Sequence, residues 1–178
     1  MDADSLKALQ APLKARYKAD PASAVITLRA KGSIDQGGIA CKLDTGRALA
    51  VAGLHPATGG SGLELCSGDM LLEALVACAG VTLKAVATAL SVPLNSARVS
   101  AEGDLDFRGT LGVDKAASVG FQSIRLRFEV DSPADAETLA QLLKLTERYC
   151  VVLQTLKGSA QLSTGLSKAH AQPAQGAR

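Results

Sequence analysis

Aromatic residues are scarce in this sequence: they make up 3% of its 178 residues, and tryptophan is absent. Proteins that bind single-stranded nucleic acid stack the bases on aromatic side chains, so this scarcity argues against such a partner. The basic residues are scattered rather than clustered, and the net charge is only +2, which argues against duplex nucleic acid and membrane surfaces. We therefore expect no nucleic-acid partner and no membrane partner.

Histidine is scarce too. The chain has two histidines, and none of its four cysteines forms a Cys-x-x-Cys pair. Structural zinc sites are built from such ligands at short spacings, so we expect no metal site. The glycine-containing loop at 55–62 lacks the Gly-x-x-x-x-Gly-Lys pattern, so we do not expect a phosphate-binding loop.

Long uninterrupted apolar runs are also missing. The first 20 residues carry charge throughout and lack the apolar stretch of a signal peptide. The uncharged stretch between Glu73 and Lys84 is about half of the roughly 20 residues that a membrane-spanning helix needs. We therefore expect a cytoplasmic protein, in which cysteines do not form a disulfide framework by default.

What the sequence has in quantity is aliphatic residues, since 47% of it is apolar. This composition and length predict one domain with a large aliphatic core. We expect an N-terminal helical extension over residues 1–20, the domain itself over 21–166 and a flexible polar tail over 167–178.

The hydrophobic periodicity predicts an α+β fold. The patterns indicate strands at 24–32, 39–43, 47–52, 97–107, 121–131 and 159–164, and helices at 69–90 and 132–150. In the clearest strand, Ile124, Leu126, Phe128 and Val130 share one face. The helix at 69–90 is apolar on all sides, so it needs cover on all sides, and one small sheet cannot supply it. We expect antiparallel sheets to pack around it, one of them contributed by a partner subunit.

The second helix shows the usual signals of a helix start. Ser132 is the predicted N-cap and Pro133 the first helical residue, with acidic residues following in the first turn. If the helix continues far enough, Cys150 extends its inward face. The predicted buried stripe is Leu139, Leu142, Leu143 and Thr146.

Four cysteines are candidates for chemistry, and each has an inert alternative. Cys78 lies in the middle of the apolar helix, where it is either a small core residue or a thiolate nucleophile whose stabilising partner comes from elsewhere in the fold. Cys150 is either core or a resolving thiol that meets Cys78. Cys66 lies just before the long helix, and its inert reading is an unreactive loop or pre-helix position. Cys41 lies in a predicted strand, where packing explains it.

Asp69 opens the long helix, where a carboxylate caps the helix or complements its dipole. It lies nine positions before Cys78, which puts the two side chains on opposite faces of a straight helix. Direct contact within one helix is therefore not expected, although Asp69 could point into a site shared with another segment.

Two segments together resemble the OsmC/Ohr superfamily. They are SGDMLLEALVACAGVTL (67–83) and LLKLTERYCVVLQTLKG (142–158), whose cysteines are 72 residues apart. The order of elements from about residue 24 to 164 is similar as well. The resemblance implies an OsmC-like fold: an intertwined homodimer in which sheets of both subunits wrap each long helix and the active sites lie at the interface.

The resemblance also implies a thiol peroxidase that reduces organic hydroperoxides. Cys78 would attack the peroxide and become a sulfenic acid, and Cys150 would condense with it to a disulfide. An external dithiol, of the lipoyl type in characterised Ohr proteins, would restore the thiols. No metal and no bound organic cofactor is implied.

The chain departs from the family pattern at several positions, which favours an OsmC-like protein outside the typical Ohr subgroup. The family's helix-opening glutamate falls at Gly68–Asp69, so Asp69 is the available carboxylate. The activating arginine has Arg29 as its nearest counterpart and Arg47 as a second choice. Val151 stands where a proline usually follows the second cysteine.

Two other functions stay open on the sequence alone. One is a non-catalytic OsmC-like protein that binds a small apolar ligand at the dimer interface. The other is a redox-sensing thiol protein in which Cys66, rather than Cys150, pairs with Cys78.

Overall fold

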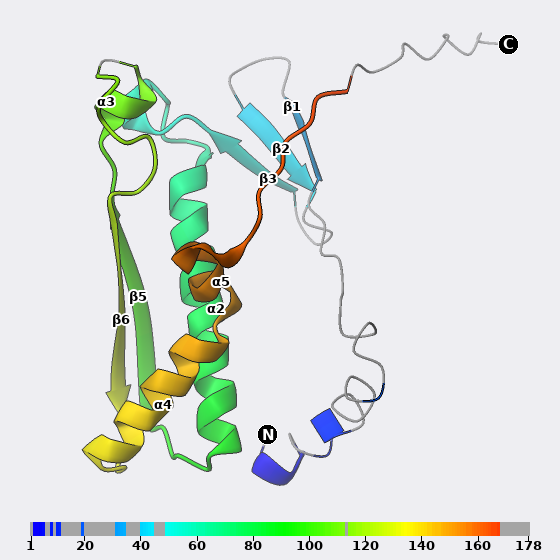
Figure 1. Cartoon of the computed structure of the whole chain (residues 1–178), viewed down its shortest axis with the longest axis vertical. Coiled ribbons are helices and arrows are strands. Elements are labelled where there is room, and N and C mark those ends of the chain that lie inside the picture. Colours follow the sequence, from blue (N-terminus) through cyan, green and yellow to red (C-terminus); the bar gives the residue numbers. More distant parts are fainter. Residues whose placement is uncertain are drawn as a thin grey trace, which may run out of the picture.

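The computed structural model describes residues 2–5, 8, 10–11, 19, 31–34, 40–44, 49–112 and 114–167. Helices and strands are mixed, as expected, with a four-stranded sheet, a two-stranded antiparallel sheet and one dominant helix (Figure 1). The elements are β1 (Lys31–Ile34), β2 (Ala40–Asp44), β3 (Leu49–Gly53), η2 (Pro56–Thr58), β4 (Leu65–Cys66), α2 (Ser67–Ala89), β5 (Ser96–Asp104), α3 (Phe107–Thr110), β6 (Ser123–Asp131), α4 (Ala136–Tyr149), α5 (Val151–Gln154) and η3 (Thr155–Ser159).

The central helix α2 agrees with the sequence prediction to within two residues. Its buried residues recur every four positions, as expected for one helical stripe: Leu75, Ala79, Leu83 and Ala87. The helix ends at Ala89; the N–H of its C-cap residue Leu90 bonds the carbonyl of Val86, and Ser91 follows with a φ of 56°. Pro93 then prevents the helix from continuing.

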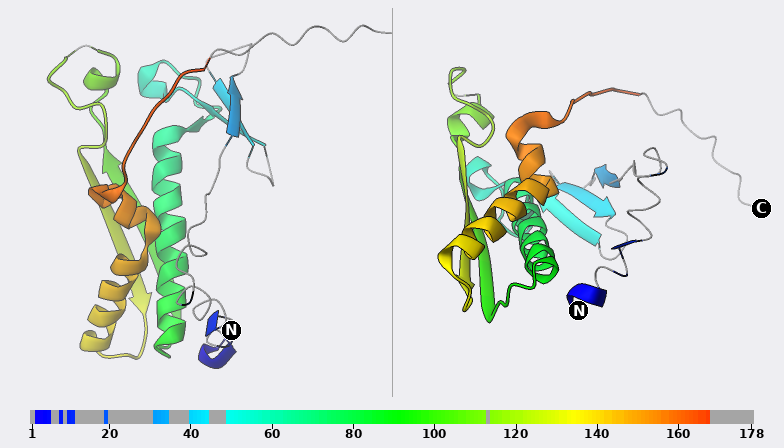
Figure 2. Two further views of the ribbon diagram at one scale, coloured as in Figure 1. Left: turned by 45° about the vertical axis from the view of Figure 1, so that its right-hand side comes forward. Right: turned by 60° about the horizontal axis from the view of Figure 1, so that its bottom comes forward.

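Of the described helices, only α2 is long and apolar enough to span a membrane, with a mean hydropathy of 1.8 over its most apolar 18 residues. It contacts β5, α4 and α5. Its buried stripe packs against the inner face of the hairpin β5–β6 and against α4, as Figures 1 and 2 show from three directions. This packing is that of the core helix of a domain.

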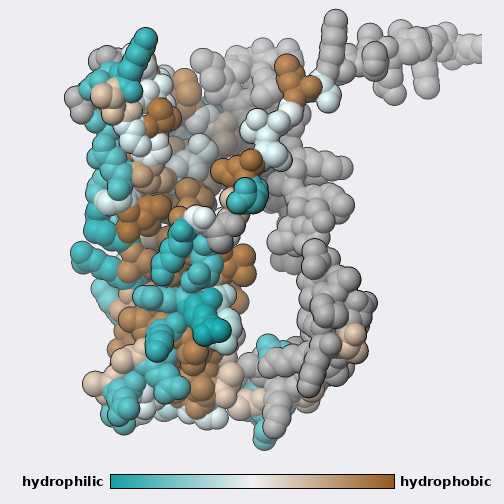
Figure 3. Space-filling view, in the orientation of Figure 1, coloured by the Kyte–Doolittle hydropathy of each residue, from teal (hydrophilic) through white to brown (hydrophobic). Residues whose placement is uncertain are grey.

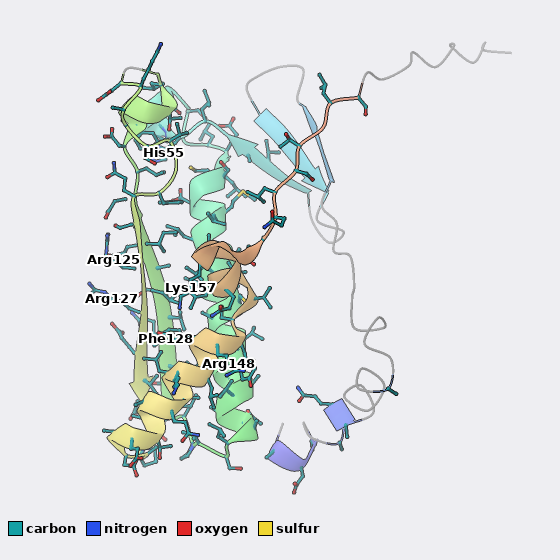
Figure 4. The ribbon with its side chains drawn as sticks, viewed as in Figure 1. His55, Arg125, Arg127, Phe128, Arg148 and Lys157 are labelled. Carbon is teal, nitrogen blue, oxygen red and sulfur yellow. The ribbon has the colours of Figure 1, made fainter. Side chains whose placement is uncertain are left out.

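The hairpin β5–β6 has one face toward α2 and one away from it. Exposure alternates strictly along β6, and Phe128 and Leu126 on the inner face pair with Val99 and Ala101 of β5. On the outer face Arg125 bonds the carboxylates of Glu102 and Asp104. Figure 4 shows Arg125 and Arg127 pointing away from α2. The period-two pattern of residues 121–131 therefore predicted this strand correctly.

The second sheet has the order β1–β2–β3–β4. β1, β2 and β3 are joined antiparallel, whereas β4 pairs parallel with β3 through Ala52 and Leu65. β2 and β3 lie within two residues of the strands expected at 39–43 and 47–52. The strand expected at 24–32 lies mostly outside the described residues.

The start of α4 corrects the sequence prediction. The N-cap is Asp135, not Ser132: its Oδ1 accepts a hydrogen bond of 2.7 Å from the N–H of Thr138. The Ser132 hydroxyl instead donates to the carbonyl of Pro93 at 2.6 Å and accepts from the N–H of Ala134. Ser132 thus links the end of β6 to the segment after α2 by a hydrogen bond. The N-cap of α4 lies three residues later than expected.

Two further expectations differ from the structure. α4 ends at Tyr149, so Cys150 is not helical, although it is fully buried. The strand expected at 159–164 is not formed, since residues 160–167 are described without β-pairing. Gly158, with a φ of 94°, turns the chain there. Of the expected N-terminal helix, residues 3–5, 8, 10–11 and 19 are helical, and the others lie outside the described residues.

Candidate functional site

Two cysteines from distant parts of the sequence meet beside α2. Cys78 lies in the middle of that helix and is half-buried, whereas Cys150 between α4 and α5 is fully buried. Cys78 packs against the cluster formed by Leu75, Ala79 and Cys150. Both cysteines are free thiols. The structure thus brings together Cys78 and Cys150, the two candidates for nucleophile and resolving thiol in the sequence.

A break in the helical path positions Cys150. Its backbone is extended, with φ −72° and ψ 105°, so it ends α4 and begins α5. Its N–H bonds the carbonyl of Thr146 at 3.0 Å, and its own carbonyl accepts from Gln154 at 2.9 Å. The side-chain amide of Gln154 also donates to the carbonyl of Glu147 across the break, at 2.8 Å. These bonds fix the angle between α4 and α5 and direct the first N–H groups of α5 toward α2.

The surroundings of Cys78 favour its thiolate. Burial raises the pKa of the Cys78 thiol, but hydrogen bonds from the Val152 backbone, the Cys150 thiol and the Val151 backbone outweigh it. The pKa of Cys78 therefore lies below its ordinary value. The first N–H groups of a helix have no partner within the helix, so Val151 and Val152 can donate to the sulfur without giving up another bond.

Thr82 is one turn away on α2 and also lowers the pKa of Cys78. Its hydroxyl, however, has a single proton, and this proton is directed to the carbonyl of Cys78 at 2.8 Å. The hydroxyl cannot serve both acceptors at once. We therefore attribute the lowered pKa of Cys78 mainly to the two backbone donors and to Cys150.

Cys150 behaves in the opposite way. Burial raises the pKa of its thiol most; the bond donated to Cys78 and the charge on Cys78 raise it further, and backbone bonds from Leu153 and Val152 only partly offset this. Cys78 therefore ionises first, while Cys150 keeps its proton and donates it. This arrangement provides a nucleophilic thiolate with a second thiol in hydrogen-bonding reach.

The model of the OsmC-like protein family matches residues 60–165 of the chain, a range that contains both cysteines and all of α2. This chain belongs to the OsmC-like family. The resemblance carried by the segments at 67–83 and 142–158 is thereby confirmed. No curated protein matches the sequence significantly.

Solved structures of the family share the fold. An OsmC-like protein from Mycoplasma pneumoniae matches with a TM-score of 0.62 at 17% identity, covering 75% of this chain and 89% of that one. An organic hydroperoxide resistance protein from Elizabethkingia anophelis gives 0.60 at 14% identity, covering 76% and 91%. One from Legionella pneumophila, named OsmC, gives 0.58 at 15% identity, covering 75% and 91%. At these identities the likeness shows the fold.

Of the other residues expected from the family pattern, Asp69 is described by the structure, and it does not lie beside Cys78 of its own chain. Asp69 is exposed in the first turn of α2, about 14 Å along the axis from Cys78 at about 1.5 Å per residue. Arg29 and Arg47 lie outside the described residues. Within the described part of the chain no cluster of three or more His, Cys, Asp or Glu residues could hold a metal ion.

Cys66 cannot pair with Cys78 within one chain. It is the N-cap of α2, twelve positions before Cys78, which corresponds to about 18 Å along the helix. A disulfide needs Cα atoms within about 7 Å of each other. The redox-sensor alternative, in its intramolecular form, is therefore wrong.

Sequence reasoning missed the backbone donors to Cys78. It looked for a cationic side chain, whereas Val151 and Val152 act through their N–H groups. One signal was available: a proline usually follows the second cysteine, and it would have no N–H to donate, but Val151 has one. The departure from the family pattern at this position thus adds a donor to the site.

Proposed function

We propose that the protein is a thiol-dependent peroxidase that reduces organic hydroperoxides. The observation that carries this proposal is the packing of the free thiol of Cys78 against the buried free thiol of Cys150. The pKa of Cys78 is lowered by the hydrogen bonds that it accepts, and the pKa of Cys150 is raised by burial. A peroxidase of this type needs one thiol ionised for attack and a second held ready to close the disulfide.

The reaction begins at the Cys78 thiolate. Its sulfur attacks the terminal oxygen of the hydroperoxide, the O–O bond breaks, and Cys78 becomes a sulfenic acid. The leaving alkoxide takes a proton, which the Cys150 thiol can supply, and departs as an alcohol. The Cys150 thiolate then attacks the Cys78 sulfur, forms the disulfide and releases hydroxide, which becomes water. An external dithiol, for which we propose the lipoyl type, restores both thiols and is itself oxidised to a disulfide.

We also propose that the protein acts as a homodimer, with the site at the interface. One face of α2 beside Cys78 stays apolar and uncovered: Val81 is 72% and Leu71 38% exposed, and Ala74 and Ala77 are exposed as well. Figure 3 shows hydrophobic residues along the line of α2, beside the hydrophilic residues of α4 that lie in front of it. A second copy laid on this face would bury apolar surface and restrict access of water to Cys78.

The dimer also gives Asp69 a role. Because about 14 Å of helix separates it from Cys78 of the same chain, Asp69 could act only on the Cys78 of the second copy. We retain Asp69, and Arg29 as its cationic counterpart, as proposed activating residues. We further propose a cytoplasmic location, since the reaction depends on thiols that a reducing compartment keeps free.

The test is to oxidise reduced protein with cumene hydroperoxide and to follow intact and peptide masses. We expect one equivalent to produce a Cys78–Cys150 disulfide with loss of two hydrogens. Cys78→Ser should abolish rapid oxidation, and Cys150→Ser should accumulate a sulfenic acid at Cys78 that dimedone traps. Cys66→Ser is the matched control and should behave as the unaltered protein. If no thiol is oxidised within minutes, the proposal fails and the apolar-ligand alternative stands.

A further inference from the structure

A pocket separate from the Cys78–Cys150 pair of its own chain lies beside the N-terminus of α2. Two adjoining cavities of about 390 and 360 Å³ there share six lining residues: His55, Cys66, Gly68, Leu105, Phe107 and Phe121. We call this site the Cys66 pocket. It lies at the end of the molecule where α3 and the first turn of α2 meet, with His55 next to α3 (Figure 4). Cys78 of the same chain is about 18 Å away along the helix.

The pocket gathers aromatic side chains in a chain that has few. Two of the three phenylalanines of the chain, Phe107 and Phe121, line the pocket. Phe107 stacks on His55, with ring centroids 5.0 Å apart and planes at 15°. Phe121 lies against Gly103, where a Cβ would come within 2.5 Å of its ring, so only glycine allows Phe121 this position. The aromatic wall is therefore a packed feature of the fold.

The polar groups of the pocket restrict what it can bind. The Nδ1 of His55 accepts a 3.0 Å hydrogen bond from the N–H of Ala57. The neutral ring therefore has its proton on Nε2, which can donate to a ligand. Among the described lining residues the charged side chains are the carboxylates of Asp69 and Asp104, and they disfavour an anion. Asp104 is already bonded to Arg125 and Ser123.

We propose that the Cys66 pocket binds a small, uncharged, ring-containing molecule with a hydrogen-bond acceptor. A volume of about 390 Å³ lies within the range of about 300–1,000 Å³ that is typical of ligand sites. The ring would stack on Phe107 or Phe121, and the acceptor would take the proton of His55 Nε2. The thiol of Cys66 lies at the pocket wall, so its accessibility reports whether the pocket is occupied.

The test uses 6-propionyl-2-(dimethylamino)naphthalene, a neutral two-ring probe whose ketone oxygen accepts a hydrogen bond and whose fluorescence rises in apolar surroundings. Titration of the reduced full chain should give a saturable increase. With the probe at about ten times its Kd, alkylation of Cys66 by iodoacetamide should slow about tenfold, because about a tenth of the sites stay open. Alkylation of Cys78, followed in the same peptide maps, should not change. Protection of Cys78 in place of Cys66 would place the probe elsewhere and overturn the proposal.

Two glycine substitutions localise the binding. A Cβ at Gly68 would lie 3.6 Å from each of Cys66 Sγ, Leu105 Cδ1 and Phe121 Cζ, an ordinary contact. The first atom of a leucine side chain therefore fits in Gly68→Leu, and its remaining atoms would enter the pocket that these three residues line. This substitution should weaken probe binding at least about tenfold, because its side chain fills the space that the probe needs. Gly165→Leu makes the same change in open space and should leave binding intact. Unchanged binding in Gly68→Leu, or an equal loss in Gly165→Leu, overturns the proposal.

The two proposals can fail separately. If Gly68→Leu does not fold, the protection of Cys66 in the unaltered protein still decides the matter. Cys78→Ser should keep the Cys66 pocket and its probe binding while it loses hydroperoxide reduction. Loss of probe binding in that variant would show that the probe occupies the Cys78 site and would refute the Cys66 pocket.

Discussion

Cys150 donates a hydrogen bond from its thiol to the sulfur of Cys78, and this bond shifts the two pKa values in opposite directions. The same proton stabilises the Cys78 thiolate and becomes harder to remove from Cys150. Both thiols are held by α2 on one side and by the break between α4 and α5 on the other. The order of ionisation is thus set by the fold, without a cationic side chain among the described residues in contact with either sulfur.

The first prediction separates the donor role of Cys150 from its resolving role. Cys150→Ala removes the donor, so the pKa of Cys78 should rise and its alkylation at neutral pH should slow about threefold to tenfold. A hydrogen bond to a charged group contributes about 1.5–3 kcal/mol, and a more basic thiolate regains part of the rate. Cys150→Ser keeps a donor and should slow alkylation less. Equal rates in the two variants would contradict the donor role.

The second prediction concerns the N–H of Val151. Val151→Pro removes this donor, whereas proline suits the first position of a helix, and the extended backbone of Cys150 suits a residue before proline. The variant should fold, and the pKa of Cys78 should rise. Val151→Ala is the matched control: the side chain is 70% exposed, so its truncation should change little, and the N–H is kept. The pH dependence of Cys78 alkylation measures both, and coinciding profiles would contradict the prediction.

Much of the fold could be predicted because its signals are local. The alternation along β6 and the apolar length of α2 determine which faces pack together. The start of α4 could not be predicted, because Ser132 and Asp135 are both good N-caps, and the choice depends on the contact between Ser132 and Pro93, a residue 39 positions earlier. Such a choice is made by tertiary contacts that no local pattern contains.

At the candidate site, too, some residues could be predicted from the sequence and others could not. Cys78 and Cys150 could be found because cysteine is a distinctive residue in a distinctive context. The donors at Val151 and Val152 could not, since a backbone N–H is present at nearly every residue and becomes a donor to sulfur only where a helix begins beside it. The end of α4 at Tyr149 could not be predicted either, because no glycine or proline follows within the next eight residues to mark the end of a helix.

The third prediction tests the uncovered face of α2. Val81 is 72% exposed on that face, so Val81→Glu should do little to the isolated chain but should place two charges in the proposed interface. We expect the homodimer to dissociate in sedimentation experiments and hydroperoxide reduction to fall with it. Leu166→Glu is the control, because Leu166 is fully exposed and lies in the segment that follows η3, not on α2. A Val81→Glu protein that still sediments as a dimer would show that this face is not the interface.

The fourth prediction follows from the opposite pKa shifts. The lowered pKa of Cys78 contributes stability that is present above the unfolded thiol pKa of about 8.5 and is lost as the pH falls through the folded value. The raised pKa of Cys150 contributes stability that is present below about 8.5 and is lost as the pH rises through its folded value. The free energy of unfolding of the reduced protein should therefore rise with pH toward about 8.5 and fall above it.

Urea unfolding at one fixed protein concentration, measured across this pH range, tests that curve. Cys78→Ser should remove the rise below about pH 8.5, because the unfolded state then no longer binds an extra proton that the native thiolate lacks. The same variant should also weaken the fall at higher pH, since part of the raised pKa of Cys150 comes from the charge on Cys78. Cys66→Ser should leave both the rise and the fall of the free energy of unfolding unchanged. A rise that survives in Cys78→Ser would mean that another group, and not the Cys78 thiolate, links stability to pH.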